Sequence, residues 1–309
     1  MRERKIERAL VTGASSMIGA ALTKALLEEG VRVTAIVRPG SKKLSILPEN
    51  APGLQVIACD ISELSTLPEE PQDAFFHFMW QGTIGPGRND TLLQEENVRY
   101  TLDAVEKAKA CGCSVFIGAG SQAEYGPKNE VLTEETPLSP VTAYGKAKKK
   151  AEELSRRLAR TLELDHVFVR ILSVYGPGDN PQTMIMQAIQ SLTHQETPSF
   201  TPAEQLWDYL YAEDAAEAFK KLAKNGRSGE AYVLGSGTAR PLKEYIYALR
   251  DAVDPTLPVG IGALPYAESQ IMNLQADIGK LTKDTGFLPE IPFEEGIRRT
   301  ICWYRENLL

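Results

Sequence analysis

Short apolar runs alternate with longer stretches of helical periodicity through the first half of the chain. Apolar runs bounded by turn residues are typical of buried strands, and apolar residues three or four apart are typical of amphipathic helices. The pattern predicts strands at 8–11, 31–37, 54–59, 73–80, 114–118 and 166–172, and helices at 20–29, 91–110 and 142–162. Such alternation favours a parallel sheet with helices on both faces, so we expect an α/β, Rossmann-type doubly wound fold.

The rhythm changes after the segment Tyr175-Gly176-Pro177-Gly178. Shorter helices are predicted at 181–193, 214–224, 241–253, 277–285 and 293–306, and short strands at 207–211 and 230–234. We interpret part of this half as a smaller α/β substrate lobe over the carboxyl ends of the sheet. The predicted division is 1–172, 206–235 and 286–309 for the dinucleotide-binding Rossmann domain, and 173–205 and 236–285 for the substrate lobe.

Composition and charge narrow the class of protein. Hydrophobic residues make up 43% and charged residues 24% of the chain, as in ordinary globular proteins. The net charge of −7 gives no basic footprint for nucleic acid. No apolar stretch approaches the ~20 residues needed to cross a bilayer, and no signal-peptide pattern opens the chain. With four cysteines and three scattered histidines, we expect a cytoplasmic protein with reduced thiols, no metal site and no membrane partner.

A glycine-containing turn, from Thr12 to Gly19, joins the first predicted strand to the first predicted helix. Backbone N–H groups at a helix N-terminus, with the helix dipole behind them, bind a pyrophosphate without any charged side chain. Strand, glycine turn and helix in this order therefore predict the phosphate-binding opening of a dinucleotide fold. The alternative is a structural turn that binds no ligand.

Tyr144 and Lys148 lie one turn apart at the start of the helix predicted at 142–162, so their side chains share a face. The unperturbed pKa of tyrosine, about 10, is too high for a base at neutral pH, and a neighbouring ammonium lowers it. Among the eleven tyrosines, Tyr144 alone has a lysine four residues on. The pair predicts a proton donor and acceptor, and a surface helix pair is the alternative.

Four segments, in this order, resemble the extended short-chain dehydrogenase/reductases, most closely the NAD-dependent epimerase/dehydratase group that acts on nucleotide sugars. They are Thr12–Gly19, Ser121 with Tyr125-Gly126, Tyr144-x-x-x-Lys148, and Arg170 with Val174-Tyr175-Gly176-Pro177. The resemblance implies hydride transfer between a nicotinamide and a substrate carbon. It also implies that Tyr144 exchanges a proton with the substrate oxygen, that Ser121 shares this oxygen, and that Lys148 bonds the nicotinamide ribose.

The cofactor positions depart from the family pattern in three places. Ser16 replaces the middle glycine of the turn. Val37 stands where NAD-preferring members place an acid, and the following Arg38 and Ser41 suit a 2′-phosphate, so we expect NADP(H), with NAD as the alternative if Arg38 only stacks or caps the sheet. Large side chains replace the small residues after the fourth strand. The implied cofactor-binding residues are Gly13, Ser15, Ser16, Met17, Ile18, Gly19, Arg38, Ser41, Asp60, Ile61, Met79, Trp80 and Gln81, with Tyr144 and Lys148.

The substrate positions also depart from the family. Gln122 and Ala123 replace the Asp-Glu pair of the dehydratases, so we expect no 4,6-dehydration. Glu124 is interpreted as a solvated loop acid, with a part in the chemistry as the alternative. Ser173 replaces a family asparagine, and Trp207 replaces an arginine that clamps the diphosphate, so Trp207 is expected to stack on a base or sugar or to pack in the core. Gln122, Ser173 and Trp207 are the expected substrate-binding residues.

Three functions follow from the resemblance, and they differ in how they use the cofactor. The leading hypothesis is reduction of a 4-keto-6-deoxyhexose on a nucleotide, with Tyr144 as proton donor. The second is a nucleotide-sugar 4-epimerase with tightly bound NAD. The third is a non-catalytic dinucleotide-sensing regulator. The resemblance also implies a homodimer formed through the helices at 91–110 and 142–162, and His77 is expected to be a buried core residue.

Overall fold

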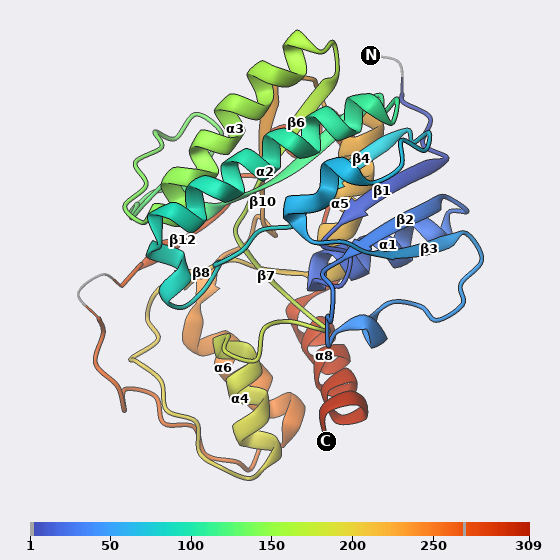
Figure 1. The fold of residues 1–309 in the computed structure, drawn as a ribbon. Helices are drawn as coiled ribbons and strands as arrows, with labels where there is room; N and C mark the ends of the chain where they lie inside the picture. The colour runs from blue at the N-terminus through green and yellow to red at the C-terminus, as the bar shows by residue number, and fades with distance from the viewer. Residues whose placement is uncertain (1–2, 268–269) are drawn as a thin grey trace.

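A seven-stranded parallel sheet organises the computed structural model, which describes residues 3–267 and 270–309 (Figure 1). Its strand order is β10-β6-β5-β4-β1-β2-β3. The strands are β1 (Arg8–Thr12), β2 (Arg32–Val37), β3 (Leu54–Ala58), β4 (Ala74–His77), β5 (Val115–Ser121), β6 (Asp165–Ile171) and β10 (Glu230–Leu234). From β1 the chain adds β2 and β3 on one side, and it then returns to add β4, β5, β6 and β10 on the other side, so the strand order reverses between β1 and β4. Doubly wound sheets bind ligands at such a point, at the carboxyl ends of their strands. The predicted doubly wound α/β fold is confirmed.

Helices cover both faces of this sheet (Figure 1). On one face, α1 (Met17–Glu28) packs against α5 (Ala212–Asn225), and on the other α2 (Thr91–Ala110) packs against α3 (Ala143–Thr161). Side chains such as Leu22, Phe76 and Phe219 fill the first interface, and Phe75, Tyr100 and Phe116 fill the second. The central strands are apolar on both faces because both faces are buried.

A second core lies beyond the carboxyl ends of the strands. It is built from α4 (Met184–Thr193), α6 (Leu242–Val253) and α8 (Phe293–Leu308) around Tyr175 and Tyr211. Two small sheets join it to the main layer: β7 (Ser173–Tyr175) with β9 (Tyr209–Tyr211), and β11 (Arg240–Pro241), β8 (Leu206–Trp207) and β12 (Asn273–Leu274). The packing of α8 with α6 groups the last helix with this second core, while α7 (Gly279–Thr285) packs against α5 and β10.

The single strand expected at 207–211 is two strands, β8 and β9, interrupted by Asp208. The Asp208 side chain is fully buried and accepts backbone N–H bonds from Ser236, Gly237 and Ala276. A carboxylate that holds three segments together turns the chain out of one sheet and into the other. The prediction of one continuous strand was wrong at this residue, because the pattern of apolar residues does not reveal the hydrogen bonds that Asp208 accepts.

The described helices include none that is long and apolar enough to cross a membrane. The described residues also hold no group of three or more histidine, cysteine or acidic side chains placed to bind a metal ion.

Candidate active site

The turn between β1 and α1 is shaped for close approach by a ligand. Gly13 has a φ of +67°, and a Cβ there would lie 3.0 Å from the backbone of Phe78 and Met79. A Cβ at Gly19 would lie 2.3 Å from the carbonyl oxygen of Gly13, so the helix begins directly against the turn. Ser16 caps α1, its hydroxyl accepting from the Gly19 N–H at 3.2 Å. These residues fit a dinucleotide pyrophosphate, which a helix N-terminus with free N–H groups attracts. Met17 and Ile18, half-buried, open the helix.

The segment after β2 is fastened across this turn. The hydroxyl groups of Ser15 and Ser41 lie 3.1 Å apart, and the Lys43 ammonium donates to the Gly178 carbonyl at 2.7 Å. A Cβ at Gly178 would meet the Ile46 side chain at 2.0 Å, so the two loops are in direct contact. Residues 41–46 therefore connect the phosphate turn with the loop after β7.

The end of β2 and the start of the segment after β3 carry the expected adenosine-side residues. Val37 is buried and Arg38 is exposed. Asp60 caps a short helix, Ile61–Thr66, by accepting from the Ser62 N–H and hydroxyl, and these bonds hold the pKa of its carboxyl below the usual value, with a smaller contribution from Arg38. Ile61 is buried. Among the described residues no hydrogen bond or ion pair holds the Arg38 guanidinium, whereas the Ser41 hydroxyl already has a partner.

The three expected catalytic residues lie together at the carboxyl end of β5 and the N-terminus of α3. Tyr144 is 8% exposed and Lys148 is 5% exposed, so neither belongs to a solvated helix surface. Burial raises the pKa of the Tyr144 phenol, and a hydrogen bond with Ser121 and the charge of Arg88 oppose this rise. The strand end and the helix start therefore bring the phenol, the hydroxyl and the ammonium to one place.

Lys148 is held by groups on three sides. Its ammonium donates to the Ala119 carbonyl at 2.6 Å and lies 3.7 Å from the centroid of the Trp80 ring. Burial lowers the pKa of Lys148 well below the usual value, and the nearby Glu124 opposes this. Trp80 in turn meets Tyr144 edge to face and donates to Gln94 at 2.8 Å.

Two expected cofactor residues flank Trp80 in different ways. Met79 is buried and packs in the core with Phe75 and Tyr100, so only its backbone faces the turn. The backbone of Gln81 exchanges two hydrogen bonds with the Asn97 side chain, at 2.9 and 3.0 Å, while the Gln81 side chain is exposed. His77 lies in the core as expected, against Thr12, and burial lowers its pKa to about 3. The expectation that its hydrogen bonds are satisfied holds for Nδ1 only, because Nε2 has no partner among the described residues.

Glu124 is not a solvated loop acid, which corrects the interpretation of the sequence. It is 0% exposed, its Oε1 accepts from the Ser121 N–H at 2.6 Å, and its Oε2 lies 3.5 Å from Arg170. Burial and the neighbouring Glu152 raise the pKa of Glu124, and Arg170 opposes them. The neighbours of Glu124 in sequence, Ala123 and Tyr125, give one signal, because an acid between apolar residues three positions after a strand can turn inward as easily as outward.

Arg88 is a second residue that sequence reasoning missed. Its guanidinium carbon lies 4.6 Å from the centroid of the Tyr144 ring, although the two residues are 56 positions apart. The loop that carries Arg88 is rich in glycine and has no periodicity, so no pattern placed it at the site.

The expected substrate residues lie at the border of the second core. The Trp207 indole donates to the Ser173 hydroxyl at 2.8 Å, and the ring packs partly against both neighbouring apolar clusters. Gln122 is half-buried and opens the short helix Gln122–Glu124 directly after Ser121. Ser173 and Trp207 are thus hydrogen-bonded to each other, and the exposed part of the indole remains available for contact with a ligand.

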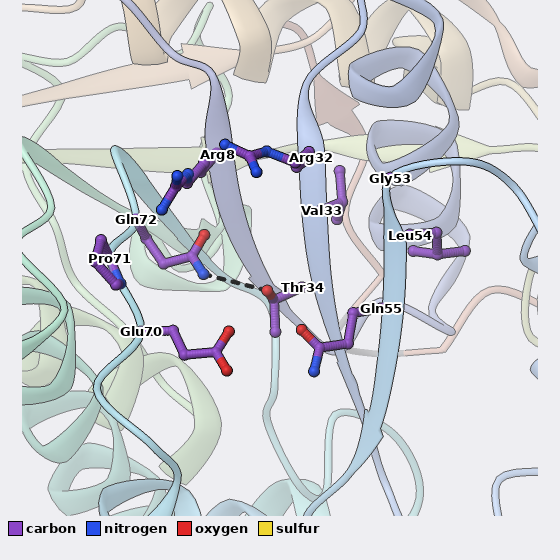
Figure 2. A pocket seen from close by; sticks show the side chains of 10 residues that line it. All are labelled: Arg8, Arg32, Val33, Thr34, Gly53, Leu54, Gln55, Glu70, Pro71 and Gln72. Atoms are coloured by element: carbon purple, nitrogen blue, oxygen red, sulfur yellow. Dashed lines mark hydrogen bonds between the residues drawn. The ribbon is translucent and has the colours of Figure 1, made fainter.

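A separate depression of about 460 Å³ lies at the amino ends of β1, β2 and β3 (Figure 2). Arg8, Arg32 and Gln72 line it, and Gln72 donates to the Thr34 hydroxyl at 3.2 Å. The amino ends are the opposite edge of a parallel sheet from the catalytic residues, so this depression is not part of the site.

Comparison with known proteins agrees with this geometry. The family model described as NAD dependent epimerase/dehydratase family matches residues 9–235. A dTDP-glucose 4,6-dehydratase of Neisseria gonorrhoeae is 26% identical, over 96% of this chain and 95% of its own. A UDP-glucose 4-epimerase of Oryza sativa subsp. japonica is also 26% identical, over 96% of this chain and 90% of its own.

Solved structures show the same fold. A UDP-N-acetylglucosamine 4-epimerase from Methanobrevibacter ruminantium M1, in complex with UDP-N-acetylmuramic acid, has a TM-score of 0.89 at 23% identity, with both chains covered completely. DesIV, a dTDP-glucose 4,6-dehydratase from Streptomyces venezuelae with NAD bound, has a TM-score of 0.84 at 24% identity and 97% coverage of each chain. The chain therefore belongs to the NAD-dependent epimerase/dehydratase family and is an enzyme of the extended short-chain dehydrogenase/reductase class.

Proposed function

We propose that this enzyme interconverts an alcohol and a ketone at C4 of a nucleotide-linked sugar, and that the net reaction is 4-epimerisation with a retained NAD. The convergence of Ser121, Tyr144 and Lys148 supports the redox step. The family and the printed names of its relatives, which are nucleotide-sugar epimerases and dehydratases, support the substrate class.

In this mechanism Tyr144 moves the proton at the C4 oxygen. A bound nicotinamide supplies the acceptor and donor of the hydride. Because burial raises the pKa of Tyr144, the phenol is protonated at neutral pH and donates when the ketone is reduced. In the oxidising direction the charges of Lys148 and Arg88 stabilise the phenolate that takes the proton from the C4 hydroxyl. Ser121, beside the phenol, would orient the same oxygen.

Dehydration is not part of the proposal, although several relatives are dehydratases. Elimination of water needs an acid and a base beside the hydroxyl residue, and Gln122 and Ala123 supply neither. The buried Glu124 is bonded to the Ser121 backbone and faces Arg170, so it is directed away from the solvent side of the site.

The observation that favours epimerisation is the fastened segment after β2. An epimerase returns its hydride to the same substrate and has no need to exchange cofactor, whereas a reductase must release the oxidised cofactor in every cycle. The Ser15–Ser41 and Lys43–Gly178 contacts join the segment after β2 to the phosphate turn and to the loop after β7, which supports retention of a dinucleotide bound at that turn. Reduction of a 4-keto-6-deoxyhexose remains the second candidate, because the missing dehydratase acids are equally compatible with it.

NADP, which the sequence favoured because of Arg38, is the alternative to the NAD of this proposal. The family name supports NAD, and the Ser41 hydroxyl is bonded to Ser15 in place of a free anion site. The absence of an acid at Val37 leaves both dinucleotides compatible with the strand end.

The test is the cofactor content of the purified enzyme and its product. We expect denaturation of the protein to release about one NAD per chain, and the 4-epimer of a nucleotide sugar to form without added cofactor. Stoichiometric loss of external NADPH with a 4-keto-6-deoxy sugar would support the reductase instead. Neither activity, across uridine and thymidine sugars, would reject the proposed function.

The division into a dinucleotide domain and a substrate lobe, and a homodimer through α2 and α3, also remain proposals. The paired helices α2 and α3 present an exposed face to solvent, with Leu92 81% exposed. Sedimentation at several protein concentrations tests the dimer.

A further inference from the structure

The loop that follows β4 is held rigidly against the catalytic residues. The Gln94 side-chain amide donates to the carbonyl oxygens of Gly82 and Gly87, at 3.0 and 2.8 Å. These two glycines touch, since a Cβ at Gly82 would lie 2.8 Å from the Gly87 carbonyl oxygen. The loop is fixed from within and from α2, so a side chain on it has a defined place before any ligand arrives.

Arg88 is the cation that this loop presents. One nitrogen of its guanidinium donates to the Thr83 carbonyl at 2.8 Å, and the plane lies over the Tyr144 ring at 4.6 Å. Across residues 3–267 and 270–309, no carboxylate lies within ion-pair distance of Arg88. A half-buried guanidinium with remaining N–H donors is a ready partner for a carboxylate.

The position of Arg88 beside Tyr144 indicates which substituents of a bound sugar would lie near its positive charge. If Tyr144 bonds the oxygen on C4, groups on C3 and C5 are its immediate neighbours on the ring. The diphosphate leaves the ring from C1, on the side opposite C4. A cation stacked on Tyr144 is therefore placed for an anion on C3 or C5 and not for the diphosphate.

We propose that Arg88 forms an anion subsite beside Tyr144 and selects nucleotide sugars that carry a carboxylate next to C4. The carboxylate is either that of a hexuronic acid, attached to C5, or that of an acidic ether substituent on C3. This inference rests on the proposed function, because it uses Tyr144 to place C4. It goes beyond it by naming a charge on the sugar as the determinant of specificity.

The experiment compares UDP-glucuronate, UDP-N-acetylmuramate, UDP-glucose and UDP alone, with the thymidine diphosphate forms of glucose and glucuronate in parallel. Binding is measured by calorimetry, and C4 chemistry by proton NMR of the products. Arg88→Met keeps the stem and removes the charge, and Arg88→Lys keeps the charge. Arg99→Met is the matched control, because Arg99 also stacks on a tyrosine, with its guanidinium carbon 5.0 Å from the Tyr100 ring, but is exposed on α2.

We expect a carboxylated sugar to be preferred over glucose, and Arg88→Met to reduce that preference about 10- to 100-fold, as charge-assisted hydrogen bonds do. Arg88→Lys should restore part of it and Arg99→Met should leave it intact. The uronate and the C3 ether are distinguished by which of them loses affinity.

Three results would overturn the inference. One is equal preference for glucose in the unaltered enzyme. Another is an Arg88→Met enzyme that keeps its preference for the carboxylated sugar. The third is equal weakening of UDP alone by Arg88→Met, which would assign the cation to the diphosphate. If no sugar reacts but the carboxylated ones still bind through Arg88, the proposed reaction fails and the anion subsite stands.

Discussion

Removing the Arg170 guanidinium should destabilise the fold strongly, because this group holds two buried carboxylates beneath the catalytic residues. Arg170 donates to both Glu152 oxygens, at 2.9 to 3.1 Å, and lies 3.5 Å from Glu124. The side chains of these three residues are 6%, 4% and 0% exposed. Burial by itself would lower the pKa of the Arg170 guanidinium. The attraction of Glu152, together with that of Tyr125 and Glu124, outweighs burial and raises this pKa.

The magnitude follows from what Arg170→Met leaves behind. Removing one partner of a buried ion pair typically costs about 3–5 kcal/mol. Arg156, 3.5 Å from Glu152, still compensates part of that charge, which places the expected loss of unfolding free energy near the lower limit, about 3 kcal/mol at pH 8. The Tyr125 hydroxyl and the Glu134 carbonyl also lose a donor.

The loss should depend on pH in a definite direction. Burial and Glu152 already raise the pKa of Glu124 above its unfolded value, and without Arg170 it rises further. An acid whose pKa is higher in the folded state costs stability once the pH exceeds the unfolded pKa of about 4.3, and this cost grows until the folded pKa is passed. The folded pKa of Glu124 in the unaltered protein is raised to about 8, so the two proteins differ in the charge of Glu124 only above that pH. The loss caused by Arg170→Met is therefore expected to be about 1–2 kcal/mol smaller at pH 5.5 than at pH 9.5.

Urea denaturation followed by tryptophan fluorescence at both pH values measures this difference. Arg299→Met is the matched control, because Arg299 pairs with Glu213 and Glu295 at the surface, where such pairs contribute about 0–1 kcal/mol. Equal losses for the two variants, or a loss for Arg170→Met that does not change between pH 5.5 and pH 9.5, would refute the reasoning.

Three further predictions address the site. Tyr144→Phe should lower the rate of C4 oxidation about 10²- to 10⁴-fold while the enzyme still binds NAD, as measured by stopped-flow absorbance and calorimetry; an active variant would remove Tyr144 from the mechanism. Lys43→Ala, which breaks the bond to Gly178, should speed the loss of bound NAD during dialysis about tenfold, and unchanged retention would count against epimerisation as the reason for that contact. Glu124→Gln removes a carboxyl group that raises the pKa of Lys148, so the alkaline limb of the pH profile of kcat/KM should move to lower pH. Glu134→Gln is the control, because Glu134 accepts from the Val233 N–H, and it should leave this limb in place.

Local spacing was enough to predict that Tyr144 and Lys148 lie together, whereas Ser121 was expected from the family resemblance. Tyr144 and Lys148 share a helix face by geometry alone, and Ser121 ends a strand whose carboxyl end meets that helix. Because parallel strands present their carboxyl ends at one edge, the order of elements also placed the phosphate turn at the same edge. These predictions required only the period of the helix and the direction of the strands.

Residues whose role depends on tertiary contact could not be predicted in this way. Arg88 reaches Tyr144 because the contact between Gly82 and Gly87 and the hydrogen bonds of Gln94 fix the shape of its loop. Neither feature produces a periodic pattern in the sequence. Glu124 turns inward because the Arg170 charge, 46 positions away, lies under Ser121. The last helix packs on α6 and also pairs with α5 through Arg299 and Glu213, and no local pattern indicates which of the distant helices it contacts.

The arrangement around Lys148 shows why a buried ammonium can remain useful in this site. An ammonium has three N–H donors. One is bonded to Ala119, and the charge lies against the face of Trp80, which attracts a cation by about 1–2 kcal/mol when both are desolvated. The neighbouring Glu124 opposes the lowering of the Lys148 pKa by burial. These contacts partly oppose the burial that lowers the pKa of Lys148. They leave N–H donors for a ribose hydroxyl, and the charge of the ammonium stabilises the Tyr144 phenolate. The large residue at position 80 is thus a support for the catalytic lysine, and its replacement by a small one would expose Lys148 to the loss of its proton.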